Sequence, residues 1–185
     1  IIFVGPRYYP YLGGVESVIA CLCPRLVKRG YRVEVYTLRF SNRLSREDVV
    51  QGIPVKRYTQ LIGDPLYLPS FSFFKGIAAQ GAGILHVHNV HTLMASVAIL
   101  AARKARQTKI VLQPHYHRVG QTRLRNLLFG LYKRIFARFL LPYVDCVIVN
   151  SEWEKEAFKK DFPKTRSIVL IPEAIDTDEL SQVTW

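Results

Sequence analysis

Two adjacent glycines, Gly13 and Gly14, lie between an apolar run, Ile1-Ile2-Phe3-Val4, and an amphipathic segment, residues 18–29. This order predicts a buried parallel strand, a loop and a crossover helix. In open α/β sheets ligands bind at the carboxyl ends of the strands, where glycines let backbone N–H groups approach an anion at a helix N-terminus. The loop is therefore a candidate phosphate site. The alternative is a plain tight turn, because the spacing is neither G-x-G-x-x-G nor a P-loop.

Histidines follow two later apolar runs. His86, His88 and His91 lie at the end of the run 83–88, and His115 follows the run 109–113, again at the expected ligand edge of the sheet. His86 and His88 alternate on a predicted strand and share a face, but no carboxylate or cysteine nearby completes a metal site. We therefore expect no bound metal.

The cysteines also carry no sign of metal or redox chemistry. Cys21, Cys23 and Cys146 are odd in number and lack metal-ligand spacing. They indicate reduced thiols, and hence a cytoplasmic protein. No run of about 18 uncharged apolar residues occurs, so no membrane-spanning helix is expected.

The formal net charge is +12, and the positive charge is concentrated in the middle of the chain. Residues 65–144 contain no Asp or Glu. They contain eleven basic residues: Lys75, Arg103, Lys104, Arg106, Lys109, Arg118, Arg123, Arg125, Lys133, Arg134 and Arg138. Such a field suits an anionic partner, which could be a phosphorylated substrate, an acidic lipid surface or nucleic acid.

Strand and helix patterns alternate along the 185 residues, which predicts one α/β domain. The expected architecture is a Rossmann-like parallel sheet flanked by helices on both faces. Strands are expected at residues 1–4, 32–38, 53–58, 83–88, 109–113, 145–150 and 167–171, and a loop at 39–52. Helices are expected at 18–29, 74–80, 92–106, 122–141 and 152–161, the last with Ser151 as N-cap and Glu154 at the capping-box position.

The segment 123–141 is amphipathic at helical spacing. Its apolar arc contains Leu131, Tyr132, Ile135, Phe136 and Phe139, whereas Arg134 and Arg138 fall outside it. One interpretation is a helix that packs one side on the sheet and exposes a solvated basic side. The other is a basic, aromatic-rich surface that docks on an anionic membrane. A single helix can do both.

Four motifs resemble the N-terminal half of a retaining glycosyltransferase of family 4, which has the GT-B fold. They are Tyr9-Pro10-x-x-Gly13-Gly14-Val15-Glu16, Leu85-His86-Val87-His88, Pro114-His115 and Ile171-Pro172-Glu173-Ala174-Ile175-Asp176. The last departs from the usual Pro-Asn-Gly-Val-Asp of that family. The resemblance implies a Rossmann-like acceptor-side domain over 1–171 and a hinge, 172–185, leading to a C-terminal nucleotide-binding domain that this chain lacks.

The same resemblance implies roles for individual residues. The amides of Gly13 and Gly14 would lie against the donor diphosphate and sugar, and His115 would be the catalytic histidine beside the reacting sugar. His88, Tyr9, Asn150 and Ser151 would bind substrate. Glu16 is interpreted as a first-turn acid that complements the helix dipole. The basic residues Arg118, Arg123, Lys133, Arg134 and Arg138 would form a membrane or acceptor surface.

The implied reaction moves a sugar from a nucleotide-sugar donor to a hydroxyl of a sugar or lipid-linked acceptor, with retention of configuration. The nucleotide-sugar is a substrate, so no cofactor and no obligatory metal are expected, and this chain alone would be inactive. A protein of this kind would be cytoplasmic or peripheral at the membrane. The alternative is a non-catalytic basic module that binds nucleic acid or acidic lipid. The aromatics lie mainly in strands and helix stripes, so nucleic acid is not expected.

Overall fold

The structure, a computed structural model, describes residues 1–11, 13–81, 83–105, 108–117 and 123–173. Within 123–139 it describes the side chains of 127, 129–136, 138 and 139. The strands are β1 (Ile2–Val4), β2 (Glu34–Arg39), β3 (Glu47–Val50), β4 (Ile53–Ile62), β5 (Leu68–Pro69), β6 (Ile84–His88), β7 (Lys109–Gln113), β8 (Cys146–Val149) and β9 (Ile168–Leu170). The helices are α1 (Gly14–Lys28), α2 (Phe71–Gln80), α3 (Leu93–Ala102), α4 (Arg123–Phe139), a short 3-10 helix (Leu141–Tyr143) and α5 (Glu152–Asp161). None of the described helices is both long and apolar enough to cross a membrane.

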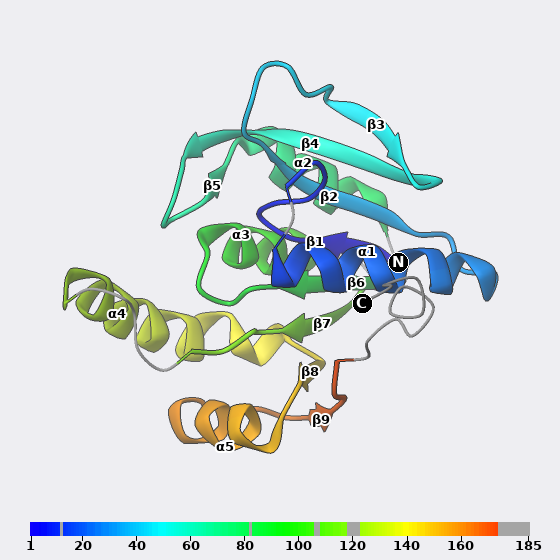
Figure 1. The fold of residues 1–185 in the computed structure, drawn as a ribbon. Helices are drawn as coiled ribbons and strands as arrows, with labels where there is room; N and C mark the ends of the chain where they lie inside the picture. The colour runs from blue at the N-terminus through cyan, green and yellow to red at the C-terminus, as the bar shows by residue number, and fades with distance from the viewer. Residues whose placement is uncertain (12, 82, 106–107, 118–122, 174–185) are drawn as a thin grey trace, which may run out of the picture.

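The strands form one sheet in the order β3-β4-β2-β1-β6-β7-β8-β9 (Figure 1). All neighbours from β4 to β9 pair in parallel, and β3 and β5 pair antiparallel with β4. The chain runs from β1 outward to β2 and β4, then returns to the other side of β1 through β6. The carboxyl ends of β1 and β6 are therefore the topological switch point, where ligands bind in open α/β sheets.

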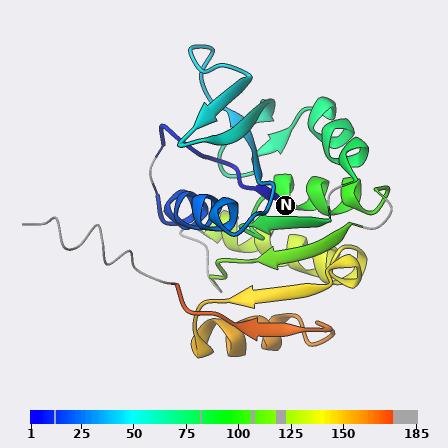
Figure 2. The ribbon, with the colours of Figure 1, turned by 90° about the vertical axis from the view of Figure 1, so that its right-hand side faces the viewer.

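Helices cover both faces of the sheet, as predicted (Figure 2). The side chains of strand residues alternate between two apolar clusters. Phe3 and Val35 point to one face and pack in a cluster with Ile19 and Cys23 of α1. Val4 and Val87 point to the opposite face, into the larger cluster that α2, α3 and α4 cover. Phe158 of α5 joins that cluster beside β8. A mostly parallel sheet with helices packed on both faces confirms the predicted Rossmann-like fold.

The segment 39–52, expected to be a loop, contains strand β3. β3 forms a hairpin with β4, and the two turn residues, Gln51 and Gly52, both have positive φ (51° and 78°). Two such residues in a two-residue loop are typical of the turn that matches the twist of a hairpin. The strand has no apolar alternation, because its Glu47 and Asp48 face solvent at the edge of the sheet. β4 is paired with β2 on one side and with β3 on the other, so it lies one strand in from the edge of the sheet.

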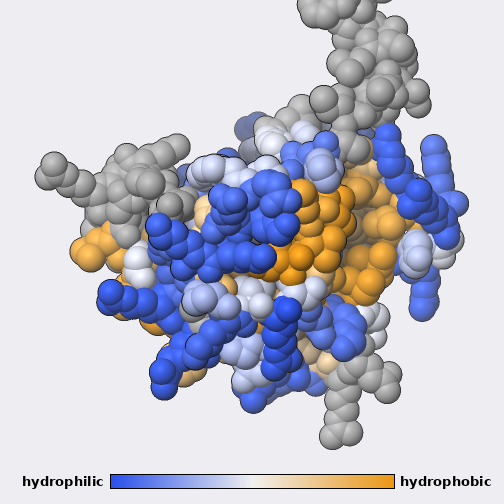
Figure 3. Space-filling model, turned by 90° about the horizontal axis from the view of Figure 1, so that it is seen from below, coloured by the Kyte–Doolittle hydropathy of each residue, from blue (hydrophilic) through white to orange (hydrophobic). Residues whose placement is uncertain are grey.

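The apolar arc of α4 is divided between the interior and the surface. Phe136 is fully buried, and Phe129 and Tyr132 pack against the main core. Four other apolar residues at every fourth position, Leu127, Leu131, Ile135 and Phe139, are 48–72% exposed. In the view from below (Figure 3), hydrophilic side chains cover most of the surface, and apolar side chains show in a large area right of the centre and in a small area at the left. The helix thus packs with one stripe and presents another.

Candidate functional site

The Gly13-Gly14 loop leads directly into α1. Gly13 is the N-cap of the helix and offers no side-chain hydrogen bond to the first-turn amides, which leaves these donors without a side-chain cap. A Cβ on Gly13 would meet Oε2 of Glu16 at 2.5 Å, whereas one on Gly14 would meet nothing within 4 Å. Gly13 and Gly14 are exposed. Gly13 therefore has the carboxylate of Glu16 beside it, whereas Gly14 presents bare backbone and open space at the carboxyl end of β1.

His88 and His115 lie in contact at the ends of neighbouring strands β6 and β7. The distance from His88 Nδ1 to His115 Nε2 is 3.1 Å, and the rings stack at 5.4 Å between centroids. His115 has a left-handed backbone (φ 47°), as does Asn89 after β6 (φ 65°). A non-glycine residue in this region is under backbone strain, and such strain clusters at functional sites. Two residues that lie apart in the sequence thus form one unit at the switch point.

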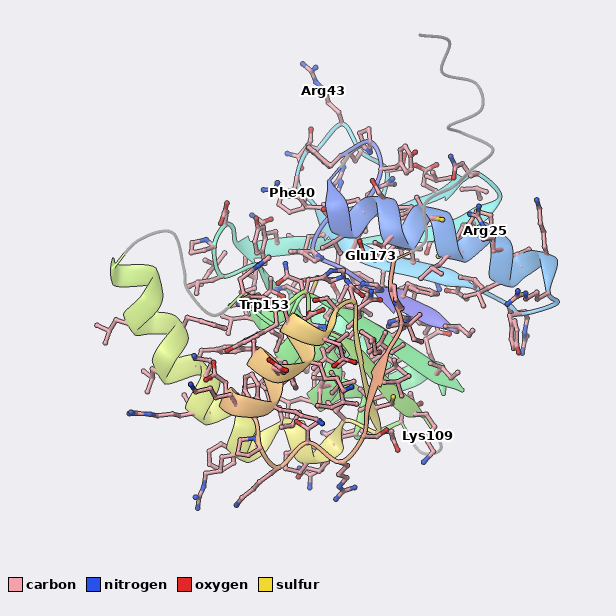
Figure 4. All side chains as sticks on the ribbon, turned by 60° about the horizontal axis from the view of Figure 1, so that its bottom comes forward. Arg25, Phe40, Arg43, Lys109, Trp153 and Glu173 are labelled. Atoms are coloured by element: carbon pink, nitrogen blue, oxygen red, sulfur yellow. The ribbon has the colours of Figure 1, made fainter. Side chains whose placement is uncertain are left out.

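Glu173, just past β9, closes a ring of polar side chains around His115. Its Oε1 lies 3.7 Å from His115 Nδ1 and accepts a 2.6 Å hydrogen bond from Nδ2 of Asn150. The Oδ1 of Asn150 accepts in turn from Nε2 of Gln113, at 2.9 Å. Figure 4 shows Glu173 near the middle of the molecule and Lys109, the first residue of β7, at the far end of the sheet. The ends of β6, β7, β8 and β9 therefore each contribute to this ring.

Glu154 of α5 holds two of these strand ends by their backbones. It is buried, and its two carboxylate oxygens accept from the amides of Tyr116 and Asn150, each at 2.7 Å. Ser151 caps α5 as predicted, since its Oγ accepts from the Glu154 amide at 3.1 Å. The capping box itself is different from the expected one, because the Glu154 side chain bonds the amides of Tyr116 and Asn150. The residue after His115 is thereby fixed in place.

Burial is the main cause of the lowered pKa of the histidines in this cluster. It lowers the pKa of His115 to about 4, with a further contribution from His117, and holds that of His88 well below its usual range. Burial also raises the pKa of Glu173, and Glu154 adds to this shift. At neutral pH the imidazole of His115 is therefore neutral, and it can both donate and accept a hydrogen bond.

The polar partners decide which ring nitrogens carry protons. If His88 donates from Nδ1 to Nε2 of His115, then His115 carries its own proton on Nδ1, facing the Glu173 carboxylate. In the other arrangement His88 would carry a buried proton on Nε2, an atom that has no hydrogen-bond partner among the described residues. A buried unpaired donor is costly, so we assign the first arrangement.

The other expected substrate residue, Tyr9, lies in the loop between β1 and α1. It is half-buried, its ring meets that of Tyr8 edge to face, and its carbonyl oxygen accepts from the buried Arg57 at 2.9 Å. Tyr9 thus belongs to the same loop as Gly13 and Gly14. Among the described residues, its ring contacts Tyr8 and not the histidines at the ends of β6 and β7.

Only some residues of the predicted basic surface carry a charge that is exposed to solvent. Arg134 and Arg138 are exposed on α4, with Arg138 lying over the ring of Phe139 at 5.7 Å. Lys133 instead pairs with Asp161 of α5 at 2.9 Å and lies over Phe129. Arg118 lies outside the described residues, and only the helical backbone of Arg123 is described. Of the three members whose side chains the structure describes, Arg134 and Arg138 are therefore the ones whose charge faces solvent.

Sequence reasoning overlooked Gln113 and the part played by Glu154, and it noted Glu173 only as a departure from a turn motif. The signal for Gln113 was its place as the last residue of a strand, next to Pro114 and His115. His86 and His88 do share a face, and their rings stack at 4.5 Å. No group of three or more histidine, cysteine or acidic residues arranged to hold a metal is found in the described part of the chain.

Known proteins share the sequence pattern of this chain. A family model described as glycosyltransferase family 4 matches residues 12–179. One subunit of the human phosphatidylinositol N-acetylglucosaminyltransferase is 30% identical over 111 residues, which cover 56% of this chain and 22% of that protein. The family model therefore matches most of this chain, and the human relative matches about half of it.

Solved structures of glycosyltransferases share the fold. A sucrose-phosphate synthase from Thermosynechococcus elongatus has a TM-score of 0.69 at 16% identity, over 96% of this chain and 48% of that chain. The HepE protein of Anabaena, solved with UDP and glucose, has a TM-score of 0.64 at 18% identity, over 96% of this chain and 45% of that chain. This chain thus spans about half the length of these structures.

Proposed function

The chain belongs to glycosyltransferase family 4, and on that premise we propose that it is the acceptor-side domain of an enzyme that moves a sugar from a nucleotide-sugar to an acceptor hydroxyl with retention of configuration. The polar ring around His115 at the switch point of the sheet is the observation that carries the proposal. The nucleotide would bind to a second domain to which the hinge, 172–185, leads, so this chain alone would be inactive.

The donor diphosphate binds at the Gly13-Gly14 loop in this proposal. The uncapped first-turn amides of α1 and the positive end of its dipole would stabilise the charge that develops on the leaving diphosphate. Charge stabilisation by amides removes the need for an obligatory metal. Transfer by the full-length enzyme is accordingly expected to persist in excess EDTA, and a complete loss of turnover that Mg²⁺ restores would contradict this part of the proposal.

His115 acts in this proposal as a neutral hydrogen-bonding group. With a pKa of about 4, His115 is neither protonated enough to act as a general acid at neutral pH nor basic enough to be a strong general base. It would instead orient the sugar or the attacking hydroxyl. The leaving diphosphate would accept the proton of the acceptor hydroxyl as the glycosidic bond forms on the face from which it departs. His88, Asn150 and Glu173 hold the ring of His115 for this task.

The acceptor is proposed to be borne by a membrane lipid. Support comes from the exposed apolar stripe and the two exposed arginines of α4, and from similarity to a human protein whose name includes phosphatidylinositol. An amphipathic helix with apolar and basic side chains binds anionic bilayers by insertion and charge. The protein would then be cytoplasmic and peripheral at the membrane.

The function is tested by incubating the full-length protein with a panel of nucleotide-sugars and extracted membranes as acceptor. The proposal expects transfer of one sugar, with the same anomeric configuration in the product as in the donor. If no donor is consumed and the protein instead shifts arbitrary DNA in a salt-dependent gel assay, the enzyme proposal fails. The non-catalytic basic module then replaces it.

A further inference from the structure

Arg7 occupies a distinctive place at the carboxyl end of β1. Its guanidinium lies over two rings, those of Phe40 at 5.1 Å and Tyr67 at 5.6 Å, and its Nη2 donates to the hydroxyl of Tyr67 at 3.0 Å. The two rings meet edge to face at 6.1 Å, and the exposed ring of Tyr11 meets Phe40 in the same way at 5.6 Å. Three aromatic residues from three segments thus build a shallow frame around one arginine.

The charge of Arg7 has no acidic partner among the described residues. Arg57 differs in this respect, since that buried arginine pairs with Asp48 and donates to two backbone carbonyls, those of Ser45 and Tyr9. A guanidinium has five N–H donors in a planar fork. Of those on Arg7, one donates to a group among the described residues, the neutral hydroxyl of Tyr67. Stacking holds the plane of the fork while its other donors stay available at a half-buried position.

The position of Arg7 connects it with the ligand edge of the sheet. β1 lies beside β6, with Val4 opposite Val87, so the segment after Val4 and the segment after Val87 leave the sheet at the same edge. His88 ends β6, and the Gly13-Gly14 loop is the continuation of the segment that holds Arg7. A ligand bound at this switch point would lie at the same edge as Arg7.

We propose that Arg7 binds a phosphate group on the acceptor, with Tyr11, Phe40 and Tyr67 framing it. This inference rests on the proposed transferase function and names the acceptor as a phosphate-bearing molecule. A planar, pre-oriented guanidinium makes two parallel hydrogen bonds to a phosphate, which a lysine cannot reproduce. The phosphate can belong to a lipid headgroup or to a free phosphorylated sugar, and Arg7 would recognise the same chemistry in both.

The test is a binding measurement on the full-length protein, so it does not depend on turnover. Glucose 6-phosphate, glucose and vesicles containing phosphatidylinositol are titrated against wild type, Arg7→Lys and Arg7→Gln. Loss of two charge-assisted hydrogen bonds is expected to weaken phosphate binding roughly 10-fold to 100-fold in Arg7→Gln, with a smaller loss in Arg7→Lys. Arg7-dependent binding of glucose 6-phosphate points to a free sugar phosphate, and Arg7-dependent binding of the vesicles alone points to a lipid. Vesicle binding that is equal in wild type and both Arg7 variants is attributed to α4 and counts against the inference.

Arg103 provides the matched control. It too lies over an aromatic ring, that of Tyr143 at 4.4 Å, but it follows α3 at the opposite, amino-terminal edge of the sheet. Arg103→Lys should leave binding unchanged. Equal phosphate affinity in wild type and both Arg7 variants would overturn the inference while transfer itself could persist. Arg7-dependent binding by a protein that consumes no donor would instead defeat the transferase proposal and leave the phosphate site standing.

Discussion

At the residue scale, a substitution at Gly14 distinguishes a plain turn from a ligand-binding loop. Alanine favours a helix over glycine by about 1 kcal/mol, and a Cβ here meets no protein atom within 4 Å. Gly14→Ala should therefore leave the free energy of unfolding equal or higher, while its methyl group enters the donor space and raises the dissociation constant of the donor roughly 10-fold. Calorimetric titration and urea unfolding measure the two quantities.

Gly130 is the matched control for this substitution. It lies inside α4, where a Cβ also meets nothing within 4 Å, and α4 is not part of the proposed donor site. Gly130→Ala should stabilise the fold by a similar amount and leave donor binding unchanged. If Gly14→Ala behaves in the same way, Gly13 and Gly14 form only a turn.

Glu154 offers a second test at this scale. Its carboxylate accepts two backbone amides, and glutamine has one acceptor oxygen, so Glu154→Gln leaves one buried amide facing an NH₂ group. The expected loss of stability is about 1–3 kcal/mol, with a lower kcat because the residue next to His115 is released. Glu156→Gln, at an exposed position on the same helix, should change neither quantity. Unchanged urea midpoint and kcat in Glu154→Gln would contradict the role given to this carboxylate.

At the scale of elements, α4 carries the prediction for membrane binding. Replacing Arg134 and Arg138 by glutamate should weaken binding to anionic vesicles roughly 10-fold or more, since each basic residue near such a surface contributes about 1 kcal/mol. Vesicle sedimentation measures this affinity. The control pair is Lys159 and Lys160, which are exposed on α5. Equal losses from the two pairs would mean that overall charge, and not α4, determines binding.

The elements also show how far sequence reasoning reaches. The predicted strand 109–113 and helix 152–161 agree with β7 and α5 to the residue, because each combines a clear apolar pattern with a terminal signal such as Ser151. β3 was missed because an exposed, acidic edge strand has no apolar period, and only Gly52 signalled its turn. Periodicity reports burial, so it cannot detect an element that buries little.

The contacts between residues of the candidate site could not be predicted from the sequence. Motif positions predicted that His88, His115 and Asn150 would lie at the ligand edge, but their contacts depend on strand order and on the left-handed backbone of His115. Glu173 reaches His115 only because β9 is the neighbour of β8. Long-range pairing of this kind leaves no trace in local sequence.

For the whole molecule, the buried histidines predict a loss of stability in mild acid. The pKa values of His86, His91 and His115 are lowered to about 4, chiefly by burial, and that of His88 is lowered as well. An unfolded histidine has a pKa of about 6.5, so between pH 6.5 and 4 the unfolded chain binds more protons than the folded one. The contribution of these neutral histidines to the free energy of unfolding is therefore complete above about pH 6.5, and it decreases as the pH drops toward 4.

Urea unfolding at about pH 7.5 and about pH 5 tests this dependence. The midpoint should be lower at the acidic pH, and the difference should shrink in His86→Phe, which removes one buried titrating group. The aspartates with lowered pKa, Asp48 and Asp145, lose their contribution only below their ordinary value of 3.8, outside this window. A midpoint that is equal or higher at the acidic pH is incompatible with neutral, buried histidines.

The central claim is that His115 serves sugar transfer, and it is tested most directly by comparing wild type with His115→Ala in the full-length protein. We predict a fall in kcat of roughly 100-fold or more with unchanged donor affinity, because the ring would act on the reacting sugar and not on the nucleotide. His117→Ala, at an exposed histidine two residues on, should retain activity. A His115→Ala enzyme that transfers sugar as fast as wild type would contradict the claim.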